Sequence, residues 1–285
     1  MTIQSTIIAL RSPELTTFFK IFPFLVSDTF YIAVIALGYW TFRNPRVFWK
    51  LGFLVPFSTL LTALLKSVFM HDRPEAALHL VTITDKSSGF PSGDVLVSVV
   101  FWGMLALHFR SKALCVFSAL IILCIMLSRI YLGVHTIDQV CGGLLFGALI
   151  LALSQSSEGQ KMFNDWQNGR TTSYWVLCAL ISLAYVAIAP EISLLVLVVV
   201  GVLIGYGVGA PLAGRYMATR TGNSRFVLAF VGLASFFAIN KIFPKIHFEK
   251  ISWIDGFIVL KYILISLVMS VFIPMMTLKM TKNKP

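Results

Sequence analysis

Residues 113–139 read ALCVFSALIILCIMLSRIYLGVHTIDQ, and this stretch indicates both the class of fold and the place to look for chemistry. Its first part, 113–132, is a nearly unbroken apolar run, and a helix needs about 20 such residues to cross a bilayer. Because the apolar residues are continuous and do not form a stripe, the predicted solvent of this helix is lipid. The run ends at Arg129 and His135, and ionisable residues at membrane depth are costly and usually functional.

The composition of the whole chain also indicates a membrane protein. The 285 residues are 58% hydrophobic and only 12% charged, and the mean hydropathy is +0.86. Soluble domains contain about 25% charged residues, which cover their surface. The net charge of +11 does not predict a nucleic-acid partner, because the cations lie in short loops between apolar runs. The four cysteines lie inside apolar runs without metal-ligand spacing, so no metal, cofactor or disulfide framework is predicted.

Hydropathy along the chain predicts an all-α fold, a polytopic transmembrane helical bundle of about nine spans. The segment 1–20 is predicted to lie at the membrane interface as a short amphipathic helix. The fifth span is short and glycine-rich, which favours close helix packing. The predicted spans are 22–41, 47–69, 94–109, 113–132, 138–154, 173–189, 191–212, 226–243 and 258–277.

The charges of the loops predict the orientation and a division of the chain. The loops after the odd-numbered spans carry more Lys and Arg than the opposite set, so they are predicted to be cytoplasmic. Loops 70–93 and 133–137 then face the periplasm or exterior, and the compact loops favour a bacterial inner membrane. The polar stretch 155–172 predicts a boundary between a catalytic core, residues 1–155, and additional transmembrane helices of unknown role, residues 156–285.

Three separated blocks concentrate polar residues at one predicted face of the membrane. The first block closes the second span, the second block opens the third span, and the third block links the fourth and fifth spans. The blocks are KSVFMHDRP at 66–74, FPSGD at 90–94 and SRIYLGVHTIDQ at 128–139.

These blocks contain the residue types that a phosphate site needs. Lys66 and Arg73 are seven residues apart, two helical turns, so both side chains can point the same way, and Arg129 adds a third cation. Converging cations bind a phosphate dianion. The Ser92 hydroxyl and the backbone N–H groups that begin at Gly93 predict an anion site at the N-terminus of a helix.

His135 is the predicted nucleophile, since imidazole attacks phosphorus when a neighbour fixes its tautomer. Asp138 and Gln139 follow three and four residues later, so either side chain can reach the ring if a helix begins here. Taken singly, a Lys or Arg at the end of a span is usually an anchor, and a lone His is usually an interface residue. Their joint occurrence at one face favours the phosphate site.

The pattern Lys66-x6-Arg73-Pro74, Pro91-Ser92-Gly93-Asp94 and Ser128-Arg129-x5-His135 resembles the three signature blocks of the PAP2 (type 2 phosphatidic acid phosphatase) superfamily. The resemblance covers about residues 10–155. It implies a helical bundle that hydrolyses lipid phosphates or diphosphates, for example a polyprenyl diphosphate, at the outer membrane boundary, without metal and through a phosphohistidine. The implied partners are a lipid phosphate substrate and the bilayer. The implied nucleophile is His135, and the implied phosphate-binding residues are Lys66, Arg73, Ser92, Gly93 and Arg129.

Two positions depart from the family pattern. Asp94 stands where the family has a general-acid His, and Gln139 stands where it has the carboxylate that follows the nucleophile. Nearby cations are expected to keep Asp94 ionised, so that it cannot protonate a leaving oxygen. This predicts that diphosphate lipids, which lose a stable phosphate anion, are better substrates than monophosphates. His71 and His79, in the same predicted outer loop, are candidate substitute acids.

Two other functions stay open from the sequence. A lipid phosphotransferase would pass the phosphoryl group from His135 to an acceptor other than water. A pseudoenzyme would bind lipid phosphates without turnover, and Asp94 is the residue that favours this alternative.

Overall fold

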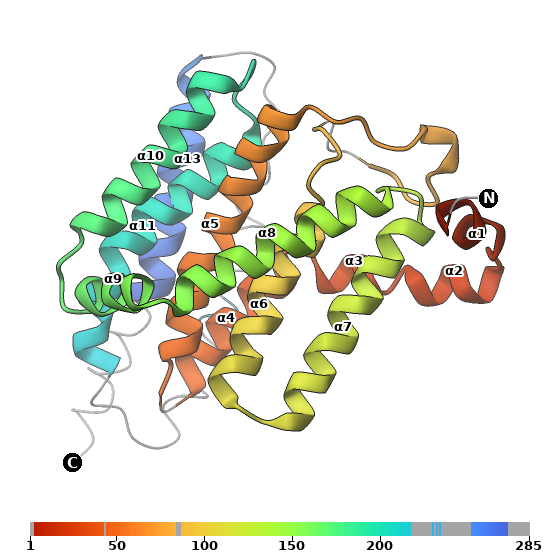
Figure 1. The fold of residues 1–285 in the computed structure, drawn as a ribbon. Coiled ribbons are helices and arrows are strands. Elements are labelled where there is room, and N and C mark those ends of the chain that lie inside the picture. Colours follow the sequence, from red (N-terminus) through yellow and green to blue (C-terminus); the bar gives the residue numbers. More distant parts are fainter. Residues whose placement is uncertain are drawn as a thin grey trace. The chain divides into compact units, whose positions relative to one another are not determined.

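The structure is a computed structural model that describes residues 3–42, 44–83, 87–217 and 252–272, together with residues 230, 232 and 234. All regular secondary structure in these ranges is helical (Figure 1), which confirms the predicted all-α class. The chain divides into two compact units. Unit 1 comprises Met1–Tyr31, Ser58–Ser156 and Leu183–Pro190, and unit 2 comprises Ile32–Phe57, Ser157–Ser182 and Glu191–Pro285.

Three helices each pass from one unit to the other, and the remaining helices lie within one unit. The passing helices are α4 (Asp28–Thr41), α5 (Arg46–Phe69) and α10 (Thr172–Ile188). The other helices of unit 1 are α1 (Ile3–Ala9), α2 (Pro13–Phe19), α3 (Phe22–Leu25), the short η1 (Ala76–Leu78), α6 (Gly93–Phe109), α7 (Lys112–Tyr131) and α8 (Ile137–Gln155). Those of unit 2 are α9 (Ser157–Gln167), α11 (Leu194–Met217), α13 (Ser252–Leu267) and η2 (Val268–Phe272).

Helix α6 is the centre of unit 1 and packs against both α7 and α8 (Figure 1). Two glycines of α8 permit the close approach to α6. A Cβ atom on Gly143 would lie 2.5 Å from the Ser92 carbonyl oxygen, and one on Gly147 would lie 2.8 Å from the Leu96 carbonyl oxygen. Small residues allow helix backbones to approach closely where lipid offers no hydrophobic drive. This contact holds the first turn of α8 beside the first turn of α6.

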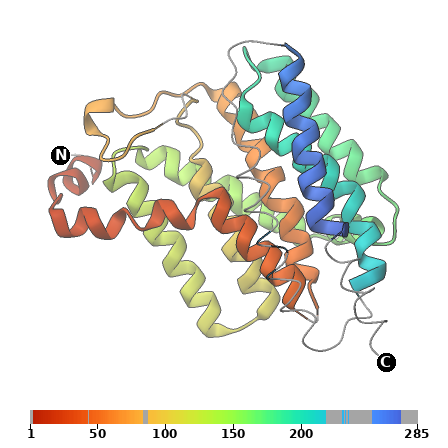
Figure 2. The same cartoon turned by 180° about the vertical axis from the view of Figure 1, so that it is seen from behind.

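The N-terminal helices α1, α2 and α3 contact α7 (Figure 2). The Arg11 guanidinium donates hydrogen bonds to the carbonyl oxygens of Tyr131, at 2.8 and 3.0 Å, and Leu78, at 2.8 Å. The Ser128 hydroxyl donates to the Phe19 carbonyl oxygen at 3.0 Å. The segment predicted as one interfacial helix is therefore a set of short helices that hold the C-terminal end of α7.

The first predicted span, 22–41, is wrong as a single helix. The segments Pro13–Leu25 and Asp28–Thr41 meet at a bend of 53°. Ser27 explains the break, because its hydroxyl accepts a hydrogen bond from the Phe30 N–H at 3.3 Å and donates one to the Phe24 carbonyl oxygen at 2.7 Å. A serine in this position ends one helix and caps the next.

Aromatic residues form the core of unit 2. The Trp166 ring lies 3.9 Å from the Trp49 ring and 4.6 Å from the Tyr174 ring, measured between centroids. Their polar atoms find backbone partners, since Trp166 Nε1 donates to the Gly207 carbonyl oxygen at 3.2 Å and the Tyr206 hydroxyl donates to the Trp49 carbonyl oxygen at 2.9 Å. The polar stretch 155–172 thus contains α9, an amphipathic helix whose Trp166 is fully buried.

Among the described residues, four helices are long and apolar enough to cross a membrane: α5, α7, α8 and residues Leu194–Leu212 of α11. The count rises to six if each of two bent helix pairs is one span, α2–α4 and α9–α10, the second bent by 113°. Helix α6 and residues Gly256–Val271 are apolar but shorter. The eighth predicted span, 226–243, lies almost entirely outside the described residues. The described helices therefore give fewer spans than the nine predicted.

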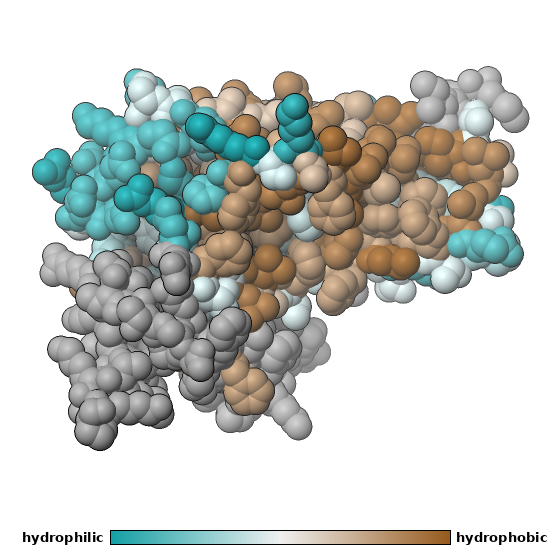
Figure 3. All heavy atoms as spheres, turned by 90° about the horizontal axis from the view of Figure 1, so that it is seen from below, coloured by the Kyte–Doolittle hydropathy of each residue, from teal (hydrophilic) through white to brown (hydrophobic). Residues whose placement is uncertain are grey.

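The exposed surface of these helices is apolar, as expected of an integral membrane protein. Hydrophobic side chains are exposed over much of the face in Figure 3. Exposed large hydrophobic residues recur along three of the helices: Val116, Phe117, Leu120 and Leu123 on α7, Leu145, Leu149 and Leu153 on α8, and Val176, Leu180 and Leu183 on α10. Lipid is the solvent that such surfaces require.

The contact between α6 and α8 can be tested by adding a single methyl group. We expect Gly143→Ala to destabilise the protein by about 1–3 kcal/mol, because the new Cβ would press on the Ser92 carbonyl oxygen. Thermal unfolding in detergent would measure the change. Leu145→Ala is the matched control on the same helix, since Leu145 is 66% exposed. Equal melting temperatures for Gly143→Ala and the wild type would contradict the tight contact.

Candidate active site

The three sequence blocks meet in unit 1 at the ends of α5, α6, α7 and α8. The Ser92 N–H, at the start of α6, donates to the Gln139 carbonyl oxygen at 2.9 Å. The N–H groups of Val134 and His135 donate to the Arg129 carbonyl oxygen at 3.1 and 3.3 Å, which folds the connection between α7 and α8 back onto the end of α7. The Leu80 N–H donates to the Leu132 carbonyl oxygen at 2.9 Å. This hydrogen bond joins the loop after the first block to the third block.

The carboxamide of Gln139 is fully buried, and two backbone groups fix its orientation. Its Nε2 donates to the Asp72 carbonyl oxygen at 2.7 Å, and its Oε1 accepts from the Thr136 N–H at 3.2 Å. The same Oε1 lies 2.9 Å from Nδ1 of His135. Because Oε1 can only accept, Nδ1 of His135 carries the proton and Nε2 keeps its lone pair.

The sequence left open whether Asp138 or Gln139 contacts the ring of His135, and the structure places Gln139 there. Asp138 instead lies on the outer side of the first turn of α8, where its Oδ2 is 3.5 Å from Nδ1 of His71. Both residues lie within one turn of His135, but only the residue four positions on faces the ring.

The ring of His135 is neutral in this environment. Only 3% of the residue is exposed. Burial, and next the positive charge of Arg73, lower the pKa of His135 from 6.5 to about 4. The charge of Asp94 and the hydrogen bond that His135 donates to Gln139 oppose this shift without cancelling it. At neutral pH His135 is therefore an unprotonated imidazole with an available Nε2.

Asp94 is held by Arg129 in an ion pair. Its Oδ2 lies 2.9 Å from Nη1 of Arg129, whose side chain is 7% exposed. One nitrogen of Arg129, a predicted phosphate-binding residue, therefore binds a carboxylate.

Two buried polar atoms beside this pair have no hydrogen-bond partner among the described residues: Ser92 Oγ and Arg129 Nε. Buried polar atoms without partners are rare in folded proteins. Both belong to predicted phosphate-binding residues, and a hydroxyl and a guanidinium N–H can each donate to a phosphoryl oxygen. Gly93 follows Ser92 as the first residue of α6, where a Cβ would meet the Thr62 methyl group at 3.1 Å.

Lys66 and Arg73, the two cations of the first block, converge on one residue. The Lys66 ammonium donates to the Ser87 hydroxyl at 2.7 Å, and Arg73 Nε donates to the Ser87 carbonyl oxygen at 3.0 Å. They do not lie on one helix face, because α5 ends at Phe69 and Arg73 follows in the loop. Sequence reasoning missed Ser87. The polar run Ser87-Ser88-Gly89 before the second block was the signal that could have found it.

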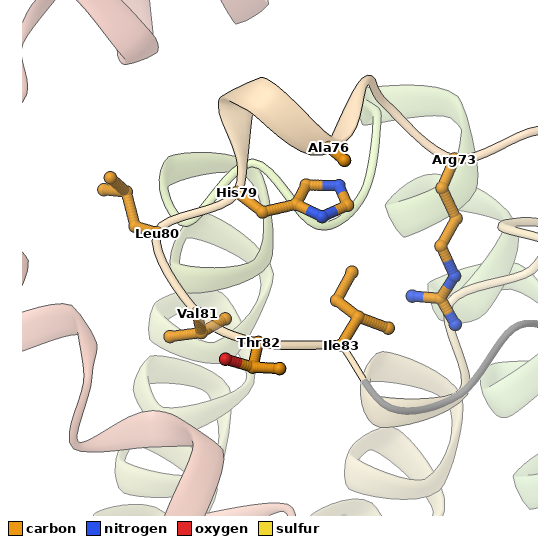
Figure 4. A pocket seen from close by; sticks show the side chains of 7 residues that line it. All are labelled: Arg73, Ala76, His79, Leu80, Val81, Thr82 and Ile83. Atoms are coloured by element: carbon orange, nitrogen blue, oxygen red, sulfur yellow. The ribbon is translucent and has the colours of Figure 1, made fainter.

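A cavity of about 540 Å³ is lined by Arg73 and by residues of the loop that follows the first block. In Figure 4 the side chains of Arg73 and His79 lie at this cavity, with Ile83 between them. His79 Nε2 lies 3.0 Å from the Pro74 carbonyl oxygen, so Nε2 carries the proton. The remaining lining residues are Ala76, Leu80, Val81 and Thr82. Among the described residues, no group of three or more His, Cys, Asp or Glu side chains could hold a metal ion.

The fold and the site define a class of protein. It is a helical membrane bundle that holds a neutral, buried histidine close to several cationic side chains. Residues 47–163 match the model of the PAP2 superfamily. The chain is 28% identical over 156 residues to lipid phosphate phosphatase delta of Arabidopsis thaliana. That match covers 49% of this chain and 37% of the relative, so the chain matches little more than a third of the relative's length.

A crystal structure is also similar, that of the first transmembrane PAP2 type phosphatidylglycerolphosphate phosphatase from Bacillus subtilis. The TM-score is 0.49 and the sequence identity is 22%, and the match covers 55% of this chain and 83% of that chain.

The lowered pKa of His135 predicts how stability depends on pH. The unfolded chain binds a proton at His135 near pH 6.5, whereas the folded chain binds it only near pH 4. This contribution to stability is therefore complete above pH 6.5 and is lost as the pH falls, by up to about 1.4 kcal/mol per pH unit. We expect His135→Asn to flatten the dependence of the unfolding temperature on pH between 6.5 and 4.5 in detergent.

The control for this measurement is His108→Asn, at an exposed histidine near the end of α6. It should leave the pH dependence as in the wild type. The same slope in His135→Asn and in the wild type would contradict the neutral, buried state of His135.

Proposed function

We propose that this chain is an integral membrane phosphatase that hydrolyses lipid phosphates or diphosphates through a phosphohistidine at His135. The observation that carries the proposal is the buried, neutral imidazole whose Nδ1 donates to Gln139 and whose Nε2 is left to attack. The match of residues 47–163 to the PAP2 superfamily model supports the reaction class, as does the lipid phosphate phosphatase named among the relatives. The catalytic part comprises residues 1–155.

In the first step, the Nε2 lone pair of His135 attacks the phosphorus atom and the bond from phosphorus to the leaving oxygen breaks. The leaving group departs with that electron pair, and the phosphoryl group stays on Nε2. In the second step, water attacks the phosphorus atom, the P–N bond breaks, and inorganic phosphate leaves with His135 restored. The hydrogen bond from Nδ1 to Gln139 holds the ring in one orientation through both steps.

Cations and hydroxyl groups would stabilise the charge on the transferred phosphoryl oxygens. Lys66 and Arg73 are brought together at Ser87, and Ser92 Oγ and Arg129 Nε are two buried donors without a partner among the described residues. Such preorganised donors act in a poorly hydrated site, where they are worth more than in water. Gln139 differs from a carboxylate here, because a neutral amide stabilises a developing imidazolium less strongly.

The leaving group is the basis for a preference among substrates. Asp94 is paired with Arg129, so a proton donor is missing at the position where the family has its general acid. An alkoxide needs protonation as it leaves, whereas a phosphate anion departs without it. We therefore propose that diphosphate lipids, such as a polyprenyl diphosphate, are the preferred substrates. The loop charges support a site at the periplasmic or outer face of a bacterial inner membrane.

The pair between Asp94 and Arg129 also favours one competing function, a pseudoenzyme that binds lipid phosphates without turnover. A lipid phosphotransferase shares the first step and differs only in the acceptor of the second. A measurement of inorganic phosphate release separates these functions. The pseudoenzyme would release no phosphate. The phosphotransferase would release phosphate only slowly, because it passes the phosphoryl group to an acceptor lipid and not to water.

The nucleophile is tested by His135→Ala. With purified protein in detergent and farnesyl diphosphate as the probe, we expect the rate of phosphate release to fall by about 10³-fold or more. His108→Ala, at the exposed end of α6, is the control for the purification and the detergent. Phosphate release that survives His135→Ala would exclude the phosphohistidine route.

The role of Asp94 is tested by comparing two substitutions. We expect Asp94→His to raise turnover of a lipid monophosphate, by up to about 10²-fold, because an imidazole can protonate the alkoxide. Asp94→Asn removes the same charge but supplies no acid, so it should not produce this gain. The ratio of diphosphate to monophosphate turnover should therefore fall in Asp94→His alone. Equal turnover of both substrates by the wild type would refute the proposed preference.

A further inference from the structure

We propose that His71 is a positioning residue for the nucleophile, because its unprotonated Nδ1 holds the Gln139 carboxamide that orients His135. This inference rests on the proposed function and assigns a part to a residue of the first block that is not among the predicted phosphate-binding residues. The link runs through three side chains. His71 Nδ1 lies 3.2 Å from Gln139 Nε2, and Gln139 Oε1 lies 2.9 Å from His135 Nδ1.

The contact between His71 and Gln139 requires one protonation state. An amide nitrogen can only donate, and the Gln139 amide cannot be turned over because of its bonds to Asp72 and Thr136. His71 Nδ1 must therefore accept, which means that the ring is neutral with its proton on Nε2. The two N–H bonds of Gln139 Nε2 are then both used, one on the Asp72 carbonyl oxygen and one on His71.

The same Nδ1 faces a second partner that requires the opposite state. Asp138 Oδ2 lies 3.5 Å away, and a carboxylate can only accept. A hydrogen bond between His71 and Asp138 therefore needs a proton on Nδ1, which turns this atom from an acceptor for Gln139 into a donor for Asp138. Both side chains are about half exposed, at 52% and 59%, so solvent can deliver the proton. The protonation of His71 Nδ1 thus decides whether it accepts from Gln139 or donates to Asp138.

Protonation of His71 would act on His135 through Gln139. Two N–H groups would then face each other at 3.2 Å, and the carboxamide would keep only the Asp72 carbonyl oxygen as its acceptor. A hydrogen bond would be lost from the group that fixes the nucleophile. The ring of His135 would be less well held, and we expect kcat to fall while KM changes little.

Three charged side chains of the described residues lie near His71. Helix α8 presents Asp138, and the chain neighbours of His71 are Asp72 and Arg73. The segment 87–90 contacts His71 through groups that do not ionise, since the Ser88 hydroxyl and the Gly89 N–H donate to its carbonyl oxygen at 3.0 and 2.6 Å and the Phe90 ring lies 6.4 Å from its ring. These bonds hold the backbone of His71 in place, so protonation acts on the side chain alone.

The test is the dependence of kcat on pH, with farnesyl diphosphate as the probe and the full chain in detergent. The wild type should lose activity in two steps as the pH falls. The lower step belongs to His135 near pH 4, and we assign the upper step to the change of partner at His71 Nδ1. Each step should follow one proton.

Three variants assign the upper step. His71→Asn puts an amide oxygen near the position of Nδ1, so it can accept from Gln139 but cannot be protonated, and the upper step should disappear. His71→Ala lacks the acceptor, so kcat should be about three- to ten-fold lower than in His71→Asn at neutral pH. Asp138→Asn removes the carboxylate that stabilises the protonated ring, so the upper step should move to lower pH. His108→Asn, the exposed control, should retain the wild-type profile.

The outcomes separate this inference from the proposed function. No phosphate release by the wild type at any pH would reject the phosphatase itself. An active wild type whose upper step persists unchanged in His71→Asn would overturn the inference about His71 and leave the phosphatase intact. A lower kcat in His71→Ala that is not restored by His71→Asn would also overturn it, because it would show a general structural effect.

Discussion

The buried carboxamide of Gln139 is the group on which the arrangement of the site depends. It accepts from the helix start at Thr136 and donates to the loop carbonyl of Asp72, so it joins the third sequence block to the first. Its backbone carbonyl accepts from Ser92, which joins the second block. A single residue thus connects all three blocks. The steric room around it is narrow, since a Cβ atom on Gly89 would collide with the carboxamide. An amide suits this place because it offers a donor and an acceptor at once, which an ionised carboxylate cannot do.

Charge is distributed unevenly around the reacting histidine. Burial keeps His135 neutral, and the positive charge of Arg73 reinforces burial. Arg129, by contrast, has its charge partly balanced by Asp94 at 2.9 Å. An ion pair at 37% exposure of the carboxylate is not worth much in stability, but it fixes the plane of the guanidinium. Asp94 thus binds the guanidinium of Arg129 at the position where a histidine would have offered a proton.

The sequence was a good guide to the class of fold and to the meeting of the three blocks, because hydropathy and joint spacing are strong signals. It could not choose between Asp138 and Gln139, since the phase of α8 depends on where its first turn begins. It did not indicate the pair between Asp94 and Arg129, because residues 35 positions apart meet only through packing of α6 on α7. The break after Leu25 could have been found, since Ser27-Asp28 is a helix-start signal inside an apolar run. The role of His71 could not, because it depends on one ring nitrogen lying between two side chains of α8.

The N-terminal helices have a practical consequence for anyone who handles this protein. Arg11 binds the last carbonyl of α7 and the carbonyl of Leu78, two places that flank the connection carrying His135. Gly133, in that connection, has a φ of +76°, and any side chain there would meet the Leu78 carbonyl oxygen and the Arg11 guanidinium. Residues 3–12 thus hold the end of the site through the hydrogen bonds of Arg11. An affinity tag or fusion partner belongs at the other end of the chain, because bulk at the N-terminus would disturb these hydrogen bonds.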